Sequence, residues 1–227
     1  MDIEIIENKQ KEIDEQIEVL TKSINKEPIY DGIISPKHYF SSPMKVLWLA
    51  REPHDVGGNY DYKIDIIDKQ NKGELKGKRY FNRFRFLQYS IENNFPAWDK
   101  KTFNSNDKEY SDLVLKAAFI NCNKVPGGAN VNWDIWRKYS DMYSNLVKKQ
   151  IDLAQPDVII ATGTLNYLES YGYLANASKF SKSYRNYFIA NNTIIFDCYH
   201  ISTRFSVENY CNEINDVLRG INAKKFK

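Results

Sequence analysis

Residues 46–55 read VLWLAREPHD, and this stretch decides how the rest of the chain is interpreted. An apolar run of strand length is followed at once by the charged residues Arg51 and Glu52, and then by Pro53. A continuous apolar run is typical of a strand that is covered on both faces. Proline lacks the N–H group that a strand donates to its neighbour, so pairing is expected to stop there. The sequence therefore predicts a buried strand that ends in polar side chains at the rim of a sheet.

The same change from apolar to polar residues occurs at two later points. Residues 118–124 read AFINCNK, and residues 194–200 read IIFDCYH. In an open α/β sheet, ligands bind beyond the carboxyl ends of the parallel strands. Three strands that each end in polar side chains therefore predict a functional site at that edge.

Helices are predicted between the strands from the spacing of apolar residues and from capping residues. Residues 52–75 are predicted to form a long loop, and Asn191 and Asn192 are predicted to form a hairpin turn. This alternation predicts an α/β fold with three layers, α/β/α, around a central, mostly parallel sheet. The expected helices cover residues 3–25, 78–93, 132–155, 162–170 and 205–218, with a brief helix from Pro36; the expected strands cover 44–50, 113–121, 158–161, 184–190 and 193–198.

The first 28 residues are predicted to form an amphipathic N-terminal helix, because isoleucines recur with helical spacing among many charged residues. Residues 29–222 are predicted to form a single α/β domain, which is a usual size for one domain. We expect the N-terminal helix to pack against this domain. A helix that dimerises two copies of the chain is the alternative, and the oligomeric state is left open.

Composition narrows the classes of protein to which the chain can belong. The 227 residues are 42% hydrophobic and carry 32 basic and 29 acidic residues, a balance that neither indicates nor excludes a nucleic-acid partner. The three cysteines form no C-x-x-C pair and show no spacing for a metal or an iron–sulfur cluster. We expect no cofactor. The acidic N-terminus is unlike a signal peptide, and no apolar run approaches the roughly 20 residues that a membrane span needs. We expect a cytoplasmic protein without a membrane partner.

The first strand end offers a carboxylate and bare backbone. Glu52 could orient and deprotonate water, or stabilise a cationic transition state. The alternative is that Glu52 forms a salt bridge with a neighbouring basic residue. Gly57 and Gly58 would allow a phosphate to approach the backbone closely.

The second strand end offers amides and an ammonium group. The side chain of Asn121 or Asn123 combines a donor and an acceptor, which suits the edge of a nucleobase. The alternative is that both residues bond to loop backbone. Lys124 adds a charge and Gly127 adds exposed backbone.

The third strand end brings His200, and His54 lies at the first. An imidazole can donate a proton at such an edge, although a structural hydrogen bond is the alternative for a single histidine. Gly163 lies at the same predicted edge, where a following helix could present N–H groups to an anion. An ordinary strand-to-helix turn is the alternative there.

Taken in order, these segments resemble the uracil-DNA glycosylase superfamily over roughly residues 30–220. Residues 50–54, AREPH, resemble the family's Gly-Gln-Asp-Pro-Tyr and Gly-Glu-Ala-Pro-Gly motif. Residues 119–124, FINCNK, resemble its Asn-x-x-Lys segment after a strand. Residues 150–163 resemble the helix, proline, strand and glycine that follow, and residues 200–202, HIS, resemble its His-Pro-Ser.

This resemblance implies a role for each matching residue. Glu52 would activate water, Asn121 would read the Watson–Crick edge of an extruded base, and His200 would donate to the oxygen of the departing base. Ser202 would contact a backbone phosphate. Breaking an N-glycosidic bond produces a cationic sugar and an anionic base, so a carboxylate and a donor are what its transition state requires. Arg51, His54, Asn123 and Lys124 would bind substrate beside them.

The sequence also departs from the family pattern. Glu52 is one methylene longer than aspartate, and Arg51 replaces a glutamine or glutamate. His54 replaces a tyrosine or glycine that shapes the base pocket, so selectivity for uracil is not implied. Ile201 replaces proline, and Arg204 stands where a wedge-like leucine is often found; arginine there could fill the gap left by a base or hold phosphate.

The favoured interpretation is a DNA glycosylase-like hydrolase that removes a modified or deaminated base without a metal, with DNA as its partner. A catalytically inactive nucleic-acid- or nucleotide-binding protein is the first alternative, in which Arg51 and Glu52 pair with each other. A hydrolase of free nucleosides is the second. Basic residues at positions 78, 79, 83 and 85 alternate with aromatic ones and would contact DNA if their helix borders the cleft; otherwise they form a solvated helix face.

Overall fold

The apolar run that ends at Ala50 forms β3, in the middle of a seven-stranded sheet. The fold is seen in a computed structural model that describes residues 2–51, 57–75, 79–96, 108–127, 133–182, 185–200 and 205–225. The sheet contains β2 (Gly32–Ile33), β3 (Val46–Ala50), β5 (Ala117–Asn121), β6 (Val158–Thr162), β7 (Ser178–Lys182), β8 (Arg185–Ala190) and β9 (Thr193–Cys198). A separate pair joins β1 (Ile29–Tyr30) to β4 (Tyr60–Asp61).

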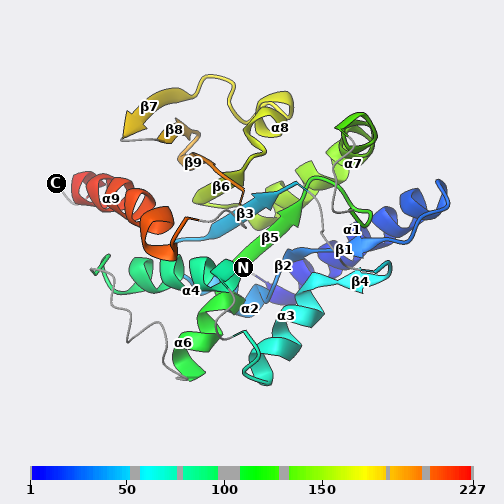
Figure 1. The fold of residues 1–227 in the computed structure, drawn as a ribbon, viewed down its shortest axis with the longest axis horizontal. Helices are drawn as coiled ribbons and strands as arrows, with labels where there is room; N and C mark the ends of the chain where they lie inside the picture. The colour runs from blue at the N-terminus through cyan, green and yellow to red at the C-terminus, as the bar shows by residue number, and fades with distance from the viewer. Residues whose placement is uncertain are drawn as a thin grey trace.

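The strands follow the order β2-β5-β3-β6-β9-β8-β7 across the sheet (Figure 1). β5, β3, β6 and β9 are parallel to one another, whereas β2, β8 and β7 pair antiparallel with their neighbours. The predicted α/β class is confirmed. The expectation of a mostly parallel sheet is only partly right, because parallel pairing is confined to the four central strands. A two-residue turn joins β8 to β9, and so short a connection can only reverse the chain.

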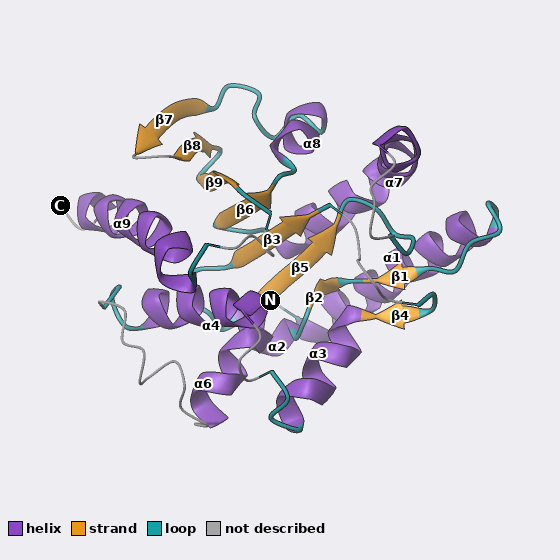
Figure 2. Ribbon diagram, viewed as in Figure 1, coloured by secondary structure: helices purple, strands orange, loops and turns teal. Residues whose placement is uncertain are grey.

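Helices cover both faces of the sheet (Figures 1 and 2). They are α1 (Ile3–Lys22), α2 (Pro36–Phe40), α3 (Tyr62–Asn71), α4 (Arg79–Glu92), α6 (Lys108–Asp112), α7 (Trp133–Ala154), α8 (Leu165–Ser170) and α9 (Val207–Lys225), with a 3-10 turn, η1 (Leu113–Lys116). Successive residues of β3 alternate between two cores: Trp48 lies in the core under α3, α4, α6 and α9, whereas Leu47 and Leu49 lie in the core under α1, α7 and α8. This alternation explains why the strand is apolar throughout.

The N-terminal helix α1 packs in the core that contains Leu47 and Leu49. Ile6, Ile13 and Ile17 are buried there against α7. The amide of Gln10 also bonds to both backbone groups of Ile33 in the edge strand β2, accepting at 2.9 Å and donating at 3.2 Å. A side chain at Gly32 would meet that amide at 2.8 Å, and the φ of +140° also favours glycine. The expected packing of the helix against the domain is therefore observed.

Three regions differ from the sequence prediction. Residues 113–116, expected to begin the second strand, form the 3-10 turn η1, and the strand itself starts at Ala117. The expected loop at 52–75 contains β4 and α3, because Asp61 caps the helix by accepting from the N–H groups of Lys63 and Ile64. The sequence between α8 and β8 contains β7, for which no strand was predicted. All five residues of β7 are exposed, so their pattern carries no periodic apolar signal. The strand pairs with β8 along its backbone, and the ring of Phe180 stacks on that of its partner Tyr187.

Neither interpretation of the basic and aromatic helix is right for Arg83 and Arg85. Both side chains are buried: Arg83 is 0% exposed and Arg85 is 3% exposed. They therefore form neither a solvated helix face nor a surface that contacts DNA. The guanidinium of Arg83 lies 4.2 Å from the ring centroid of Tyr210, and that of Arg85 lies 5.4 Å from the ring of Tyr110. Aromatic rings pack against these cations inside the core that contains Trp48.

The predicted hairpin turn supplies a direct test of the fold. Asn191 and Asn192 both have positive φ, 47° and 67°, in the two-residue loop between β8 and β9. We predict that Asn192→Val lowers the free energy of unfolding by about 1–2 kcal/mol, because a β-branched residue is strained in this conformation. Asn192→Gly is the matched control and should leave stability unchanged or raise it, as measured by urea denaturation. An equal loss in both variants would contradict the backbone explanation.

Candidate functional site at the carboxyl edge of the sheet

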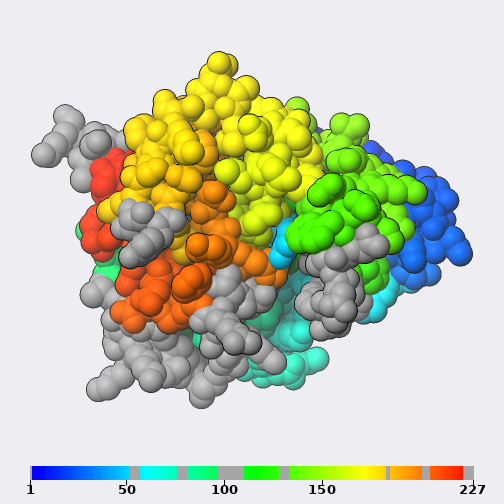
Figure 3. All heavy atoms as spheres, turned by 45° about the horizontal axis from the view of Figure 1, so that its top comes forward, coloured from blue at the N-terminus to red at the C-terminus, as the bar shows by residue number. Residues whose placement is uncertain are grey.

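The four parallel strands end together, as the sequence predicted for three of them. Ala50 at the end of β3 is opposite Asn121 at the end of β5, and Thr162 at the end of β6 is opposite Cys198 at the end of β9. Gly163 continues this edge by donating its N–H to the carbonyl of Cys198 at 2.8 Å. Figure 3 shows this face, where α7 in green, α8 in yellow and the orange residues of β9 and of the start of α9 are visible.

The connections that leave the edge define where a ligand would bind. From β3 the chain passes to α3 and α4 on one face of the sheet, whereas from β6 it passes to α8 on the other. Strands whose connections diverge in this way open a crevice at their carboxyl ends. Arg51 and Gly163 lie at this point, and a Cβ on Gly163 would be 3.8 Å from Nε of Arg51.

A pocket of about 320 Å³ adjoins the crevice on the face covered by α7 and α8. Its lining includes Trp133, Arg137, Asp141, Gly163 and Asn166, and the guanidinium of Arg51 lies 5.3 Å from the centroid of the Trp133 ring. A flat ring, cationic groups, a carboxylate and an amide thus surround one space. This combination suits a planar polar ligand or one that carries phosphate.

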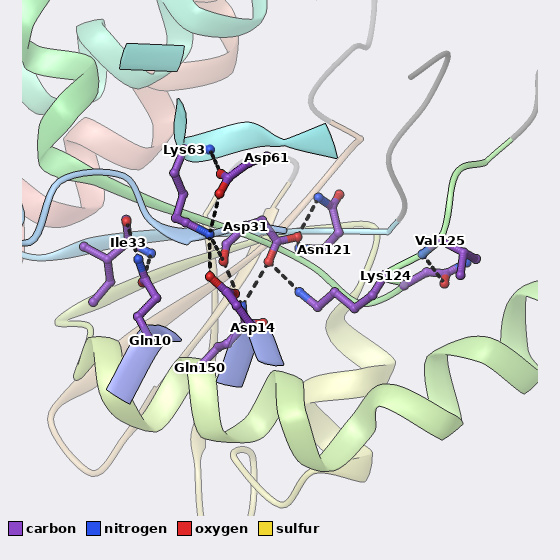
Figure 4. A network of polar contacts seen from close by, with 11 residues as sticks. Gln10, Asp14, Asp31, Ile33, Asp61, Lys63, Asn121, Lys124, Val125 and Gln150 are labelled. Atoms are coloured by element: carbon purple, nitrogen blue, oxygen red, sulfur yellow. Dashed lines mark hydrogen bonds and ion pairs between the residues drawn. The ribbon is translucent and has the colours of Figure 1, made fainter. Parts of the chain in front are cut away.

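Asn121 and Lys124 belong to a buried polar network centred on Asp31 (Figure 4). The carboxylate of Asp31 accepts from the backbone N–H of Asn121 at 2.9 Å, from its side-chain amide at 3.0 Å and from the ammonium of Lys124. Gln150 of α7 donates to the backbone carbonyl of Asp31 at 2.9 Å and to its carboxylate at 3.2 Å. Asp31 and Lys124 form an ion pair in which both side chains are fully buried.

This network fixes the orientation of the Asn121 side chain. Because a carboxylate only accepts hydrogen bonds, the amide nitrogen must face Asp31, and the amide oxygen points away from it (Figure 4). Burial lowers the pKa of Lys124, and the nearby Asp31 opposes that effect by favouring the charged ammonium. The side chain of Lys124 is thus committed to the interior of the protein and is not at its surface.

Three other predicted binding residues have identified neighbours within the chain. The side-chain oxygen of Asn123 accepts from the N–H of Val125 at 3.3 Å, which is the loop-bonding alternative. Gly58 is needed because a Cβ there would lie 2.0 Å from that of Glu27. The N–H of Gly163 is used in its bond to Cys198, and a φ of +75° explains why glycine is present.

Of the remaining predicted site residues, three lie within the described parts of the chain and four lie outside them. His200 is partly buried two residues beyond β9, Gly57 is exposed, and Gly127 is partly buried after β5. Glu52, His54, Ser202 and Arg204 lie outside the described residues. The structure therefore brings Arg51, Gly163 and the strand ends that lead to Asn121 and His200 to one edge.

The described residues contain no group of three or more His, Cys, Asp or Glu side chains placed to hold a metal ion. Cys122, Cys198 and Cys211 are buried free thiols. Burial raises the pKa of Cys198 to about 11 and those of Cys122 and Cys211 to about 12, so these thiols are protonated at neutral pH and are poor nucleophiles. Within the same parts of the chain, no helix is long and apolar enough to span a membrane.

Sequence reasoning missed Asp31, Trp133 and Arg137. Asp31 lies between the short apolar pairs that form β1 and β2, which is a local hint of a buried carboxylate. The residues that donate to its carboxylate are about 90 or more positions away, so no short motif reveals them. Trp133 begins α7, and nothing in its spacing marks it as a site residue.

Comparison of the sequence with protein-family models gives no match, and comparison with curated proteins gives none either.

The buried ion pair predicts a large loss of stability when one partner is removed. Lys124→Met should lower the free energy of unfolding by about 3–5 kcal/mol, because the Asp31 carboxylate is left buried and uncompensated. Lys22→Met, which removes an exposed ion pair with Glu18, should change the urea midpoint little. The double variant Asp31→Asn, Lys124→Met should recover part of the loss. Equal, small effects in both single variants would contradict this assignment.

A second carboxylate near this network predicts a pH dependence. Burial raises the pKa of Asp14 to about 6, although the Lys63 ammonium 3.0 Å away opposes the rise. The folded protein therefore holds this proton more tightly than the unfolded chain, so stability should fall by about 3 kcal/mol as pH rises from about 4 to 6. Asp14→Asn should lack this fall in urea denaturation at several pH values, and Asp68→Asn, at an exposed position of α3, should retain it. Parallel curves for all three proteins would refute the assignment.

Proposed function

We propose that this protein is a DNA glycosylase-like hydrolase that cleaves the N-glycosidic bond of a modified or deaminated base without a metal. One observation carries the proposal: β3 and β9 end at the same edge, on either side of β6. Arg51, which immediately precedes Glu52, follows β3, and His200 follows β9. Because neighbouring strands are about 4.8 Å apart, the two strand ends are about 10 Å apart. A base and its sugar can lie between groups so placed.

The chemistry assigns a separate task to each end. Glu52 would stabilise the sugar cation and orient water, and His200 would donate to the base as negative charge develops. Arg51 stacks on Trp133, so it has a partner other than Glu52. The resemblance of residues 50–54 and 200–202 to the uracil-DNA glycosylase motifs supports the same assignment.

DNA is the proposed substrate because the pocket beside the crevice combines an aromatic ring with guanidinium groups. Trp133 and Arg137 line this pocket, and Arg51 lies over the Trp133 ring. Such groups bind bases by stacking and phosphates by charge. A base in a duplex must be extruded at a cost of a few kcal/mol, so a damaged or unpaired base is the favoured target.

A second candidate is a nucleic-acid- or nucleotide-binding protein that performs no chemistry. It is favoured by the network at Asp31, which engages the amide nitrogen of Asn121 and the ammonium of Lys124 inside the protein. A base reader would then have mainly the amide oxygen of Asn121 to offer. A hydrolase of free nucleosides would use the same edge without DNA contacts.

Oligonucleotides that contain uracil, hypoxanthine or xanthine test these functions directly. After incubation with the protein, alkali converts each abasic site to a strand break. We predict breaks with the unaltered protein, and a loss of at least about 10²-fold in rate for Glu52→Gln and for His200→Ala. Glu208→Gln, at an exposed position of α9, is the control and should retain activity.

Each alternative has its own outcome in this assay. If the protein binds the oligonucleotides but produces no strand breaks, the proposed hydrolase function is wrong and a nucleic-acid-binding function is supported. Release of base from free nucleosides alone would indicate the nucleoside hydrolase. Breaks that persist in Glu52→Gln and His200→Ala would show that the assigned residues are not the catalytic ones.

A further inference from the structure

A second pocket opens on the other face of the same edge, between the end of β9 and α9. Its volume is about 470 Å³, which lies within the range of small-molecule sites. It is lined by Arg185, Tyr199, Phe205, Asn209, Asn212 and Glu213. None of these residues belongs to the pocket beside Trp133, so the two spaces are separate and lie on opposite faces of the sheet.

Two exposed aromatic rings, those of Tyr199 and Phe205, line this second pocket. Tyr199 is 54% exposed and Phe205 is 48% exposed, and both belong to the small set of large hydrophobic residues at the surface of the described chain. Their ring centroids are 5.2 Å apart, and the ring planes are inclined by 43°. Exposed rings held close together are the usual platform on which a base stacks.

Two amide side chains also line this second pocket. Asn209 and Asn212 are three positions apart on α9, so they lie on the same face of the helix. Each amide offers donors and an acceptor. That pairing complements the polar edge of a nucleobase, which also presents donors and acceptors in one plane.

The two charged residues that line the pocket, Arg185 and Glu213, form an ion pair with each other. Arg185, which is only 8% exposed, donates from Nε to the carboxylate of Glu213 at 2.8 Å and from Nη1 to the sulfur of Cys198 at 2.7 Å. Its guanidinium lies 4.5 Å from the centroid of the Tyr210 ring. Because the carboxylate of Glu213 balances the guanidinium, a neutral polar ring suits the pocket better than a phosphate or carboxylate does.

We propose that this second pocket binds a nucleobase, stacked against Tyr199 and Phe205 and hydrogen-bonded by Asn209 and Asn212. The base can come from a single-stranded nucleic acid or from a free nucleoside. Its place at the carboxyl edge favours a base of the strand that enters the crevice. Such binding requires no catalysis, so it holds for a hydrolase and for a binding protein alike.

Fluorescence of 2-aminopurine tests this pocket. We predict that its emission, in a short single-stranded oligodeoxynucleotide, is quenched on binding by the unaltered protein. Tyr199→Ala and Phe205→Ala should weaken binding by about 5- to 150-fold, the usual range for a base–aromatic stack. Phe180→Ala is the matched control, because Phe180 is 41% exposed on β7 and does not line the pocket. Asn212→Leu should weaken binding without unfolding the protein, as checked by circular dichroism.

Two further measurements show whether the base that binds in this pocket comes from a free nucleoside or from a single strand. Quenching of the free 2-aminopurine nucleoside with the same dependence on Tyr199 and Phe205 would assign the pocket to nucleosides. Quenching of the oligonucleotide alone would assign it to single strands. The proposal is overturned if an abasic oligonucleotide of equal length binds equally well, or if Phe180→Ala weakens binding as much as Tyr199→Ala does. This assay measures binding and not strand cleavage. It therefore tests the second pocket even if the glycosylase assay shows no strand breaks.

Discussion

The buried carboxylate of Asp31 is the constraint on which the carboxyl edge of the sheet depends. Through it, the link between β1 and β2 is joined to the end of β5, to Lys124 and to α7. Buried charges are tolerated only when they are paired and fully hydrogen-bonded, so this arrangement allows few alternatives. The Asp31 carboxylate thus holds the end of β5 in place at the candidate site. None of the sequence motifs includes this residue.

The central strands could be predicted because each is an apolar run covered on both faces, and β3 is buried at all five positions. The long helix α7 and the turn at Asn191 and Asn192 also left clear local signals. Helix α3 was missed although Asp61 caps it, because the surrounding glycines and charges favoured a loop. Strand β7 was not predicted, because all five of its side chains are exposed and show no periodic apolar pattern. Its pairing with β8, which includes the stacked rings of Phe180 and Tyr187, is visible only in the folded chain.

The location of the candidate site was more predictable than the roles of its residues. Strand ends are marked by a change from apolar to polar residues, and parallel strands place those ends at one edge. What a side chain does there depends on partners far away in the chain. The amide of Asn121 faces Asp31, and Asn123 bonds to its own loop, because of contacts that only the folded chain creates. Trp133, which contacts Arg51, and the ring pair Tyr199 and Phe205, which lines the second pocket, were likewise not predicted from the sequence.

The amide of Gln10 has a consequence for how copies of this protein can meet. By bonding both backbone groups of Ile33, it ends the sheet at β2 as a neighbouring strand would. Sheet extension between molecules is thereby confined to the opposite border, at β7. Lys179 and Lys182 lie on that border strand, and like charges brought together by a second copy would repel each other. Two devices, a side-chain amide at one border and lysines at the other, thus protect a single sheet against growth into larger aggregates.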